Sequence, residues 1–230
     1  MRRFRTYNIP KNARGAAVAI GNFDGVHLGH QAIIDIARVQ AQKISAPLGI
    51  LTFEPHPRSF FSKKLDKDFP SFRLMNANAR FHRLEKLGVD LLLEIPFNQA
   101  LCELSDWEFS KKILNDSFGL SHVVVGSDFC FGKDRGGTAR SLENHAAKLG
   151  FGLTIAKMKN HGNKVISSTN IRQALTEANP QKAAAMLGHW HRIEATVEHG
   201  EKRGRELGFP TVNITIAGLQ PPAFGVYAVL

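Results

Sequence analysis

Short apolar runs alternate with helical patterns along most of this chain, and this alternation constrains the fold more than any other feature of the sequence. The runs are strand-sized and rich in leucine and β-branched residues, which is typical of parallel strands covered on both faces. Strands that alternate with helices in this way predict an α/β fold, a Rossmann-like doubly wound parallel sheet with right-handed crossovers. The expected strands are residues 16–20, 48–53, 89–95, 122–125 and 151–156, and the expected helices are residues 29–43, 78–87, 106–115, 138–149, 169–175 and 181–187.

The pattern changes at Gly188. From there on, turns rich in glycine and proline separate strand-like runs at residues 193–197, 212–216 and 226–230. A chain of 230 residues has room for about one and a half domains. We therefore expect an α/β domain over residues 1–187 and the N-terminal part of a small all-β barrel over residues 188–230. The chain stops inside an expected strand, so the second unit is expected to be incomplete or to borrow stability from the first.

Composition excludes several classes of protein. Hydrophobic residues make up 43% of the chain and charged residues 22%, which excludes intrinsic disorder. No apolar run approaches the ~18 residues that a membrane span needs. The two cysteines, Cys102 and Cys130, lie far apart in the sequence, which argues against a disulfide framework and favours a reducing, cytoplasmic setting. Nothing in the sequence indicates an oligomeric state.

The formal net charge of +10 favours anionic partners, which are nucleotide phosphates, nucleic acid or an acidic membrane surface. The lysines and arginines are scattered and form no basic block with interleaved aromatic residues. A nucleic-acid surface is therefore the weaker interpretation, and a solvated basic face is the alternative. The N-terminus is arginine-rich and has no acidic residue before Asp24, as in organelle transit peptides. It lacks the apolar region of a secretory signal, and residues 16–20 already predict the first buried strand.

A glycine-rich segment with two histidines joins the first expected strand to the first expected helix. It reads Gly21-Asn22-Phe23-Asp24-Gly25-Val26-His27-Leu28-Gly29-His30. Glycines let the backbone approach a phosphate closely, and the start of a helix offers free N–H donors and the positive end of its dipole. His27 and His30 lie one turn apart and can donate to one anion without a permanent charge. The alternative is that both imidazoles only cap the helix.

A second segment, Ile166-Ser167-Ser168-Thr169-Asn170-Ile171-Arg172, opens a later expected helix. Its three hydroxyl groups can cap that helix or bind polyphosphate oxygens. Arg172, about one turn into the helix, can hold two such oxygens at once. By itself the segment supports a helix cap as well as it supports a phosphate site.

Together the two segments resemble the nucleotidyltransferase superfamily, in which an H-x-G-H helix and a distant S-x-x-x-R helix start enclose the triphosphate of ATP. Three further segments make the match closer: residues 52–57 with Phe60 and Phe61, residues 124–132, and residues 204–213. In this order they resemble the bacterial bifunctional riboflavin kinase/FMN adenylyltransferase family, also called FAD synthetases. The resemblance covers nearly the whole chain.

This resemblance implies a sheet of the nucleotidyltransferase type and FAD synthesis by Mg²⁺-dependent adenylyl transfer from ATP to FMN, with release of pyrophosphate. It gives catalytic roles on the phosphates to His27, His30 and Arg172. Phe60 and Phe61 can also be core residues, and the nearby prolines can simply end a strand. The resemblance implies ATP binding by Gly21, Asn22, Phe23, Asp24, Gly29, Ser167 and Ser168, and flavin binding by Pro55, Pro57, Phe61 and Asp128.

The same resemblance implies a riboflavin kinase unit, which converts riboflavin to FMN with ATP. In that unit Thr211 and Asn213 would be ligands of Mg²⁺-ATP. The rest of the barrel, with the family's catalytic acidic residue, has no counterpart before Leu230, so kinase activity of this polypeptide is doubtful. Cys130 is a smaller departure, because it stands where the family usually has arginine.

Other functions share these features. One is an adenylyltransferase whose acceptor is another small phosphorylated metabolite, and another is a non-catalytic flavin- or nucleotide-binding module. A basic RNA-binding protein is a third, but the chain supplies no aromatic stacking platform of the usual kind. The enzymatic interpretation requires the two phosphate-binding segments to meet in one cavity.

Overall fold

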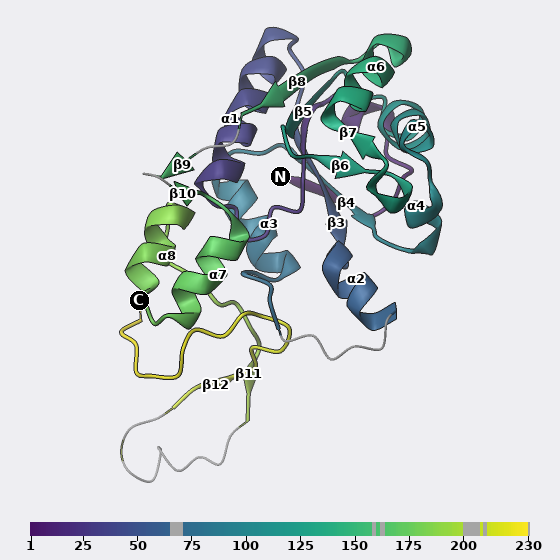
Figure 1. The fold of residues 1–230 in the computed structure, drawn as a ribbon. Helices are drawn as coiled ribbons and strands as arrows, with labels where there is room; N and C mark the ends of the chain where they lie inside the picture. Colours follow the sequence, from purple (N-terminus) through teal and green to yellow (C-terminus); the bar gives the residue numbers. More distant parts are fainter. Residues whose placement is uncertain (65–70, 158–159, 162–163, 200–207, 209–210, 230) are drawn as a thin grey trace.

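A computed structural model describes residues 1–64, 71–157, 160–161, 164–199, 208 and 211–229. Its centre is a six-stranded sheet with the order β1-β4-β3-β2-β5-β8, in which every strand runs parallel to its neighbours (Figure 1). The predicted doubly wound parallel sheet is therefore confirmed. The strands are β1 (Arg2–Phe4), β2 (Ala17–Ile20), β3 (Leu48–Glu54), β4 (Leu91–Pro96), β5 (His122–Gly126) and β8 (Gly152–Ala156).

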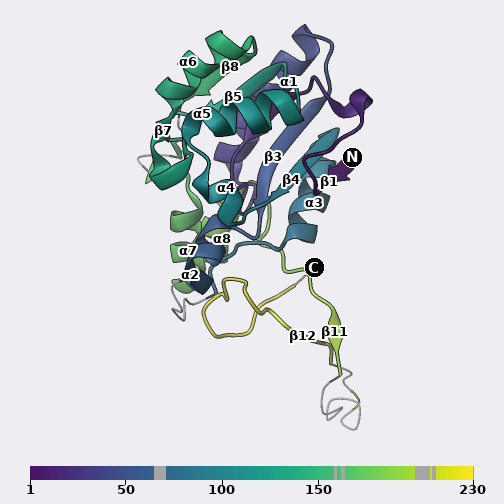
Figure 2. The same cartoon turned by 90° about the vertical axis from the view of Figure 1, so that its right-hand side faces the viewer.

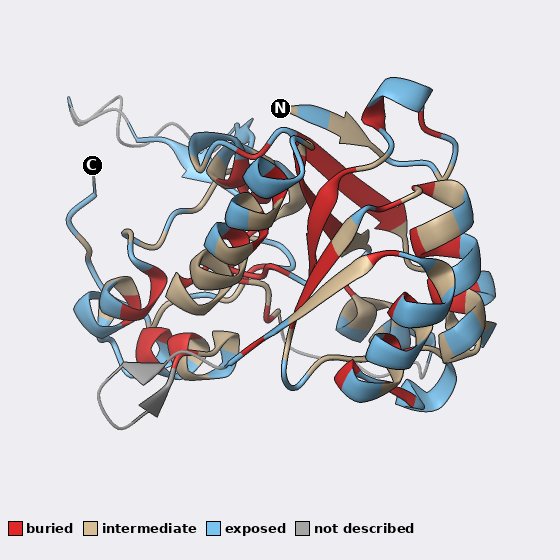
Figure 3. Ribbon diagram, turned by 90° about the horizontal axis from the view of Figure 1, so that it is seen from above, coloured by how far each residue is buried: buried red, intermediate tan, exposed pale blue. Residues whose placement is uncertain are grey.

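Helices cover both faces of the sheet, and a separate core fills each face. Because successive strand residues point to opposite faces, Ile50 packs in one core and Leu51 in the other. Buried residues are concentrated in the central strands, as Figure 3 shows. The first face is covered by α1 (Leu28–Lys43) and α3 (Ala77–Lys86), and the second by α6 (Ala139–Leu149) and by the π-helix η2 (Phe109–Ser117), which directly follows α5 (Asp106–Glu108).

The last two helices, α7 (Ser168–Thr176) and α8 (Pro180–Leu187), form a third apolar cluster together with Leu74. Gln31 ties this cluster to the start of α1, because its amide donates to the carbonyl oxygens of Val26 and Leu187, each at 2.9 Å. The smaller elements are η1 (Lys11–Ala13), α2 (Pro57–Lys64), α4 (Gln99–Glu103), β6 (Cys130–Phe131), η3 (Lys133–Arg135), β7 (Gly137–Thr138), β9 (Asn160–His161) and β10 (Lys164–Val165).

The basic N-terminus forms a strand that the sequence pattern did not predict. We expected the first strand at residues 16–20, whereas β1 precedes it and pairs with β4 at the edge of the sheet. The Arg3 and Arg5 side chains reach the buried carboxylate of Glu94 at 2.6 and 2.8 Å. Charge pairing with one buried acid thus accounts for part of the arginine-rich N-terminus.

The helix expected at residues 106–115 is present in a different form. A single turn, α5, begins under a capping box made by Ser105 and Glu108, and the chain then winds as a π-helix from Phe109. Periodicity over ten residues does not separate 3.6 from about 4.4 residues per turn, which is why an α-helix was expected.

Residues after Gly188 make far less strand than we expected. The structure has β11 (Val197–Glu198) paired antiparallel with β12 (Asn213–Ile214), and residues 226–229 form no strand. Figure 2 shows the β11–β12 pair extending away from the sheet. The side chains of both strands are exposed, so the pair buries little apolar surface. An isolated pair of strands that buries so little is only marginally stable, which explains why the strands stay short. The chain then returns to the first unit, where Leu219 is buried and bridges to Arg73.

Candidate active site

The sheet has a topological switch point between β2 and β5, where the strand order reverses. In sheets of this type, ligands bind in the crevice beyond the carboxyl ends of the strands at such a point. The glycine-rich segment after β2 begins here, and the start of α7 lies against it. The Ser168 hydroxyl donates to the Asp24 carbonyl oxygen at 2.9 Å, and Arg172 Nη2 lies 3.4 Å from Asp24 Oδ2. The two segments that the sequence singled out therefore meet.

Both segments line one cleft of about 1150 Å³. Phe23 does not line it, because its side chain is fully buried with its ring 5.0 Å from that of His30. Pro55 is exposed outside the cleft, and so are Thr211 and Asn213 in the C-terminal segment. The other residues assigned from the sequence all line the cleft: Gly21, Asn22, Asp24, His27, Gly29, His30, Pro57, Phe61, Asp128, Ser167, Ser168 and Arg172.

His27 is the N-cap residue of α1, and its Nδ1 accepts a hydrogen bond from the backbone N–H of His30 at 3.2 Å. Because Nδ1 is an acceptor, the ring carries its proton on Nε2 and can donate from there. Burial lowers the pKa of His27 to about 4, so the imidazole is neutral at physiological pH. The helix cap thus fixes both the tautomer and the charge of this ring.

His30 stacks on His27 with ring centroids 3.6 Å apart. Its Nδ1 is buried and has no hydrogen-bond partner in the part of the chain that the structure describes. Burial, together with the neighbouring His27, lowers the pKa of His30 well below its ordinary value. A buried polar atom without a partner costs free energy unless a ligand or water binds it, so this atom is a candidate contact for the substrate.

Asp24 and Arg172 join the two segments through side chains that are themselves fixed. Asp24 is 3% exposed, and its Oδ1 accepts a hydrogen bond from Leu74 N at 2.8 Å. Burial raises the pKa of Asp24, although the Arg172 guanidinium opposes the rise. Arg172 Nε donates to the Phe72 carbonyl oxygen at 2.9 Å. The remaining guanidinium donors of Arg172 are thereby oriented at the cleft, which it lines.

The other end of the cleft is aromatic. Phe61 is 45% exposed and packs edge-on against Phe97, with centroids 5.8 Å apart. Phe53 also meets Phe97 edge-on at 5.7 Å, and all three rings line the cleft. Exposed aromatic surface inside a concave site suits a flat apolar ligand. The cleft is therefore lined both by polar groups that suit an anion and by exposed aromatic surface.

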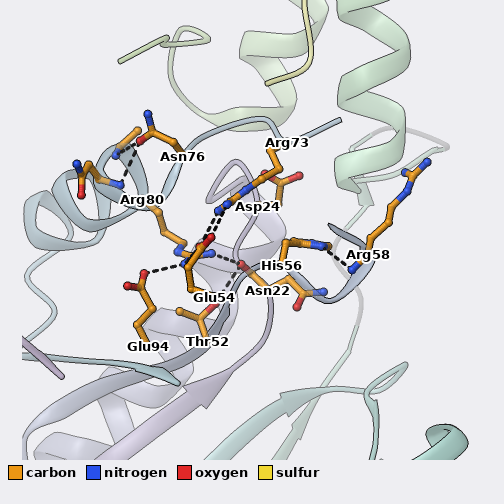
Figure 4. A network of polar contacts seen from close by, with 12 residues as sticks. Asn22, Asp24, Thr52, Glu54, His56, Arg58, Arg73, Asn76, Arg80 and Glu94 are labelled. Atoms are coloured by element: carbon orange, nitrogen blue, oxygen red, sulfur yellow. Dashed lines mark hydrogen bonds and ion pairs between the residues drawn. The ribbon is translucent and has the colours of Figure 1, made fainter. Parts of the chain in front are cut away.

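An ionic network of largely buried side chains contacts the glycine-rich segment at Asn22 (Figure 4). Arg80 on α3 is 1% exposed and binds Glu54 at 2.9 Å and Glu94 at 2.8 Å, while Arg73 holds both carboxylate oxygens of Glu54. Arg80 also donates to the Asn22 carbonyl oxygen at 3.3 Å. Burial alone would raise the pKa of Glu94, but hydrogen bonds from the arginines hold it below its ordinary value. The network thus fixes the backbone at the start of the site.

The neutral histidines make stability depend on pH. Their folded-state pKa values lie below the ordinary histidine value of 6.5, with His27 at about 4 and His56 at about 3. Between these values and 6.5 the unfolded chain binds more protons than the folded one, so stability is lost as pH falls. We expect His27 alone to cost about 2 kcal/mol at pH 5 relative to pH 7. Urea unfolding at both pH values checks this, and a His27→Asn variant that keeps the full loss would contradict it.

Two family models match this chain, and the boundary between them lies close to the change of pattern at Gly188. A family model described as FAD synthetase matches residues 9–170, and one described as riboflavin kinase matches residues 187–230. A protein of Pseudomonas fluorescens named bifunctional riboflavin kinase/FMN adenylyltransferase is 38% identical over 97% of this chain and 70% of its own length. The chain belongs to the bifunctional riboflavin kinase/FMN adenylyltransferase family.

Other members of this family with the same name are 36% identical in Haemophilus influenzae and 34% identical in Escherichia coli K12. The first covers 97% of this chain and 71% of its own length, and the second 94% and 67%. A crystal structure from Streptococcus pneumoniae, described as a macrolide-efflux protein, superposes with a TM-score of 0.81 at 29% identity, covering 98% of this chain and 73% of that one. In the described residues of our chain, no helix is long and apolar enough to cross a membrane.

Several residues that line this family member's cleft were not assigned from the sequence. His56 is buried at its wall, and Arg58 follows at the start of α2. Pro57 occupies the first position of α2, a preference that could have predicted this helix. Lys133 and Arg135 line the cleft close to Cys130. They place basic groups next to Cys130, where the resemblance led us to expect arginine.

Proposed function

We propose that this chain is an FMN adenylyltransferase, which makes FAD and pyrophosphate from ATP and FMN. The observation that carries the proposal is the meeting of two segments 144 residues apart in one cleft, through the hydrogen bond from Ser168 to Asp24. A cleft lined by polar groups that suit an anion and by exposed aromatic surface matches a reaction between a nucleoside triphosphate and a flavin phosphate. The family membership of the chain supports the same reaction.

Adenylyl transfer needs no covalent enzyme intermediate. A phosphate oxygen of FMN attacks the α-phosphorus of ATP, a new P–O bond forms, and the bond to pyrophosphate breaks with its electron pair on the leaving oxygen. The protein's tasks are to align the two anions and to stabilise the charge that develops between them. The two phosphate-bearing substrates repel each other. Hydrogen-bond donors around the α-phosphoryl group, where the charge develops, therefore contribute most to catalysis.

His27 would donate from Nε2 to an α-phosphoryl oxygen, and His30 would contact the same group. Ser167 caps α7 by accepting from Asn170 N at 3.2 Å, which leaves its hydroxyl hydrogen for a phosphate oxygen. Ser168 differs, because its hydroxyl already donates to Asp24. We therefore give Ser167 and Arg172 the outgoing pyrophosphate, and Ser168 the task of joining the two segments.

The residues present fit a magnesium ion that is bound mainly through substrate phosphates. No group of three or more histidine, cysteine, aspartate or glutamate side chains in the described residues forms a metal cluster of its own. Mg²⁺ commonly uses only one or two protein ligands together with phosphates and water. Asp24 and Asn22 line the cleft and would be those ligands. The ion would offset the negative charge of the phosphates.

At the aromatic end we propose that Pro57 and Phe61 contact the isoalloxazine ring and that Asp128 contacts the flavin side of the pocket. We further propose that residues 1–187 are the adenylyltransferase unit and residues 188–230 part of a riboflavin kinase unit. In that unit Thr211 and Asn213 would bind Mg²⁺-ATP. Both cysteines are free thiols, which suits a cytoplasmic enzyme.

The test is direct. Purified protein with ATP, MgCl₂ and FMN should form FAD and pyrophosphate, whereas a His27→Ala His30→Ala variant should form almost none. Nicotinate mononucleotide and phosphopantetheine, offered as acceptors, should give no product. If one of these acceptors gave a product and FMN did not, the proposed acceptor would be wrong. Binding of FMN and ATP without turnover would make the protein a binding module.

A further inference from the structure

A third segment, residues 72–74 just before α3, contacts both members of the pair formed by Asp24 and Arg172. The Phe72 carbonyl oxygen accepts a hydrogen bond from Arg172 Nε at 2.9 Å. The Leu74 N–H donates to Asp24 Oδ1 at 2.8 Å. Because Asp24 and Arg172 join the two sides of the cleft, the position of residues 72–74 decides how that pair is held.

The side chains on either side of Arg73 are fixed by burial. Phe72 is 6% exposed and Leu74 is 2% exposed. The Phe72 ring also lies against the guanidinium groups of Arg58 and Arg172, whose central carbons are 4.6 and 5.5 Å from the ring centroid. A cation–π contact restricts where a guanidinium group can point. A shift of this short segment would therefore be felt on the cleft side of Arg172.

The backbone of Arg73 pairs with residues 218–220, far along the chain. Its N–H donates to the Gly218 carbonyl oxygen at 3.4 Å, and its own carbonyl oxygen accepts from Gln220 N at 2.8 Å. These two bonds make a parallel bridge between Arg73 and Leu219. Leu219 is 6% exposed, although Gly218 beside it is exposed. Residues 72–74 lie outside the helices and the central sheet, so this bridge satisfies backbone groups there and restricts local opening.

Two further contacts tie the bridge to the framework of the site. The Arg73 side chain binds both carboxylate oxygens of Glu54, at 2.7 and 3.0 Å (Figure 4). Farther along the chain, Ala223 N donates to the Leu175 carbonyl oxygen at 2.9 Å, near the end of the helix that carries Arg172. In Figure 1 this yellow part of the chain passes close to α7. The C-terminal chain thus contacts both a neighbour of the pair and the helix of one of its members.

We propose that Leu219 is a positioning residue for the cleft. Its bridge to Arg73 fixes residues 72–74. These in turn fix the directions in which the Asp24 carboxylate and the Arg172 guanidinium face the cleft. Leu219 lies in the stretch that the riboflavin kinase model matches, so the second unit supplies part of the framework of the first unit's site. The effect on catalysis rests on the proposed function, whereas the effect on residues 72–74 does not.

Amide hydrogen exchange of a Leu219→Ala variant, followed by NMR, tests the structural step. We expect the Leu74 N–H, which donates to Asp24, to exchange at least about 10-fold faster relative to the N–H of Val124 inside the sheet. Leu120→Ala is the matched control, because Leu120 is 4% exposed, precedes β5 and does not line the cleft. This control lowers overall stability, but it should not raise the ratio of the two exchange rates.

Steady-state kinetics of FAD formation test the effect on the substrate. Asp24 and Arg172 are proposed to act on Mg²⁺ and the pyrophosphate part of ATP. Leu219→Ala should therefore raise KM for Mg²⁺-ATP by about 3- to 30-fold and change KM for FMN by less than about twofold. Leu120→Ala should change neither KM by more than about twofold. Leu219→Met keeps the side-chain volume and should restore the wild-type KM. Gln220→Pro removes one N–H donor of the bridge and should raise the same KM as Leu219→Ala.

The inference fails if the exchange ratio stays at its wild-type value in both Leu219→Ala and Gln220→Pro. It also fails if the ratio rises but KM for Mg²⁺-ATP does not, if KM for FMN rises as much, or if Leu120→Ala has the same effects. A wild-type protein that forms no FAD would refute the proposed function. The exchange ratio alone would then decide whether Leu219 fixes residues 72–74.

Discussion

A His27→Asn variant is expected to lose about 10²- to 10³-fold in kcat/KM for FAD formation, while its melting temperature stays near that of the wild type. Asparagine is a good N-cap, so its carbonyl oxygen can replace Nδ1 as the acceptor for the His30 N–H. It lacks the Nε2 donor that would reach the phosphate. The variant therefore separates the two tasks of His27, capping the helix and contacting the substrate. Steady-state kinetics with FMN and ATP measure the loss.

A matched control is His122→Asn. His122 begins β5 at the opposite end of the strands, where its Nε2 lies 2.9 Å from Thr154 Oγ1, and it does not line the cleft. This control should keep kcat/KM within about twofold. Wild-type kinetics in His27→Asn would show that the imidazole is only a helix cap.

The second large effect concerns stability. An Arg80→Met variant should lose about 3 kcal/mol of the free energy of unfolding, because the buried carboxylate of Glu94 and the half-buried carboxylate of Glu54 each lose a hydrogen bond from a charged donor. It should also release the Asn22 carbonyl oxygen and so loosen the glycine-rich segment. Urea unfolding, followed by circular dichroism, measures the change.

Lys86→Met on the same helix is its control, since Lys86 is exposed. That substitution should change stability by no more than about 0.5 kcal/mol. If Arg80→Met loses less than about 1 kcal/mol, the network is not a major source of stability. A triple variant with apolar residues at 54, 80 and 94 would then show whether the charges are needed at all.

Local patterns predicted the sheet because each of its inner strands is apolar on both faces. β1 escaped prediction because its residues are two arginines and a phenylalanine, and only pairing with β4 and the charge of Glu94 make it a strand. For the strand-like runs after Gly188, we predicted more strand than the structure contains. Their composition favours strands, but β11 and β12 find little surface to pack against.

For the site, the sequence motifs identified residues that line the cleft, but they could not identify residues placed there by contacts between distant parts of the chain. His27, His30, Ser167 and Arg172 carry recognisable spacing, and they all line the cleft. The place of Arg58 depends on Phe72, a residue of no motif that lies between α2 and α3. The difference between Ser167 and Ser168 likewise follows from one long-range hydrogen bond that spacing does not contain.

The hydrogen bond from Ser168 to Asp24 closes a chain loop of 144 residues, so the two sides of the cleft cannot meet until the chain has been synthesised beyond α7. Contacts of such high sequence separation raise the contact order and slow folding. On the ribosome, the histidines would emerge long before the arginine that faces them. Under the proposed function, nucleotide would bind only after α7 has docked, and its binding free energy would favour chains with α7 in place over every intermediate that lacks it.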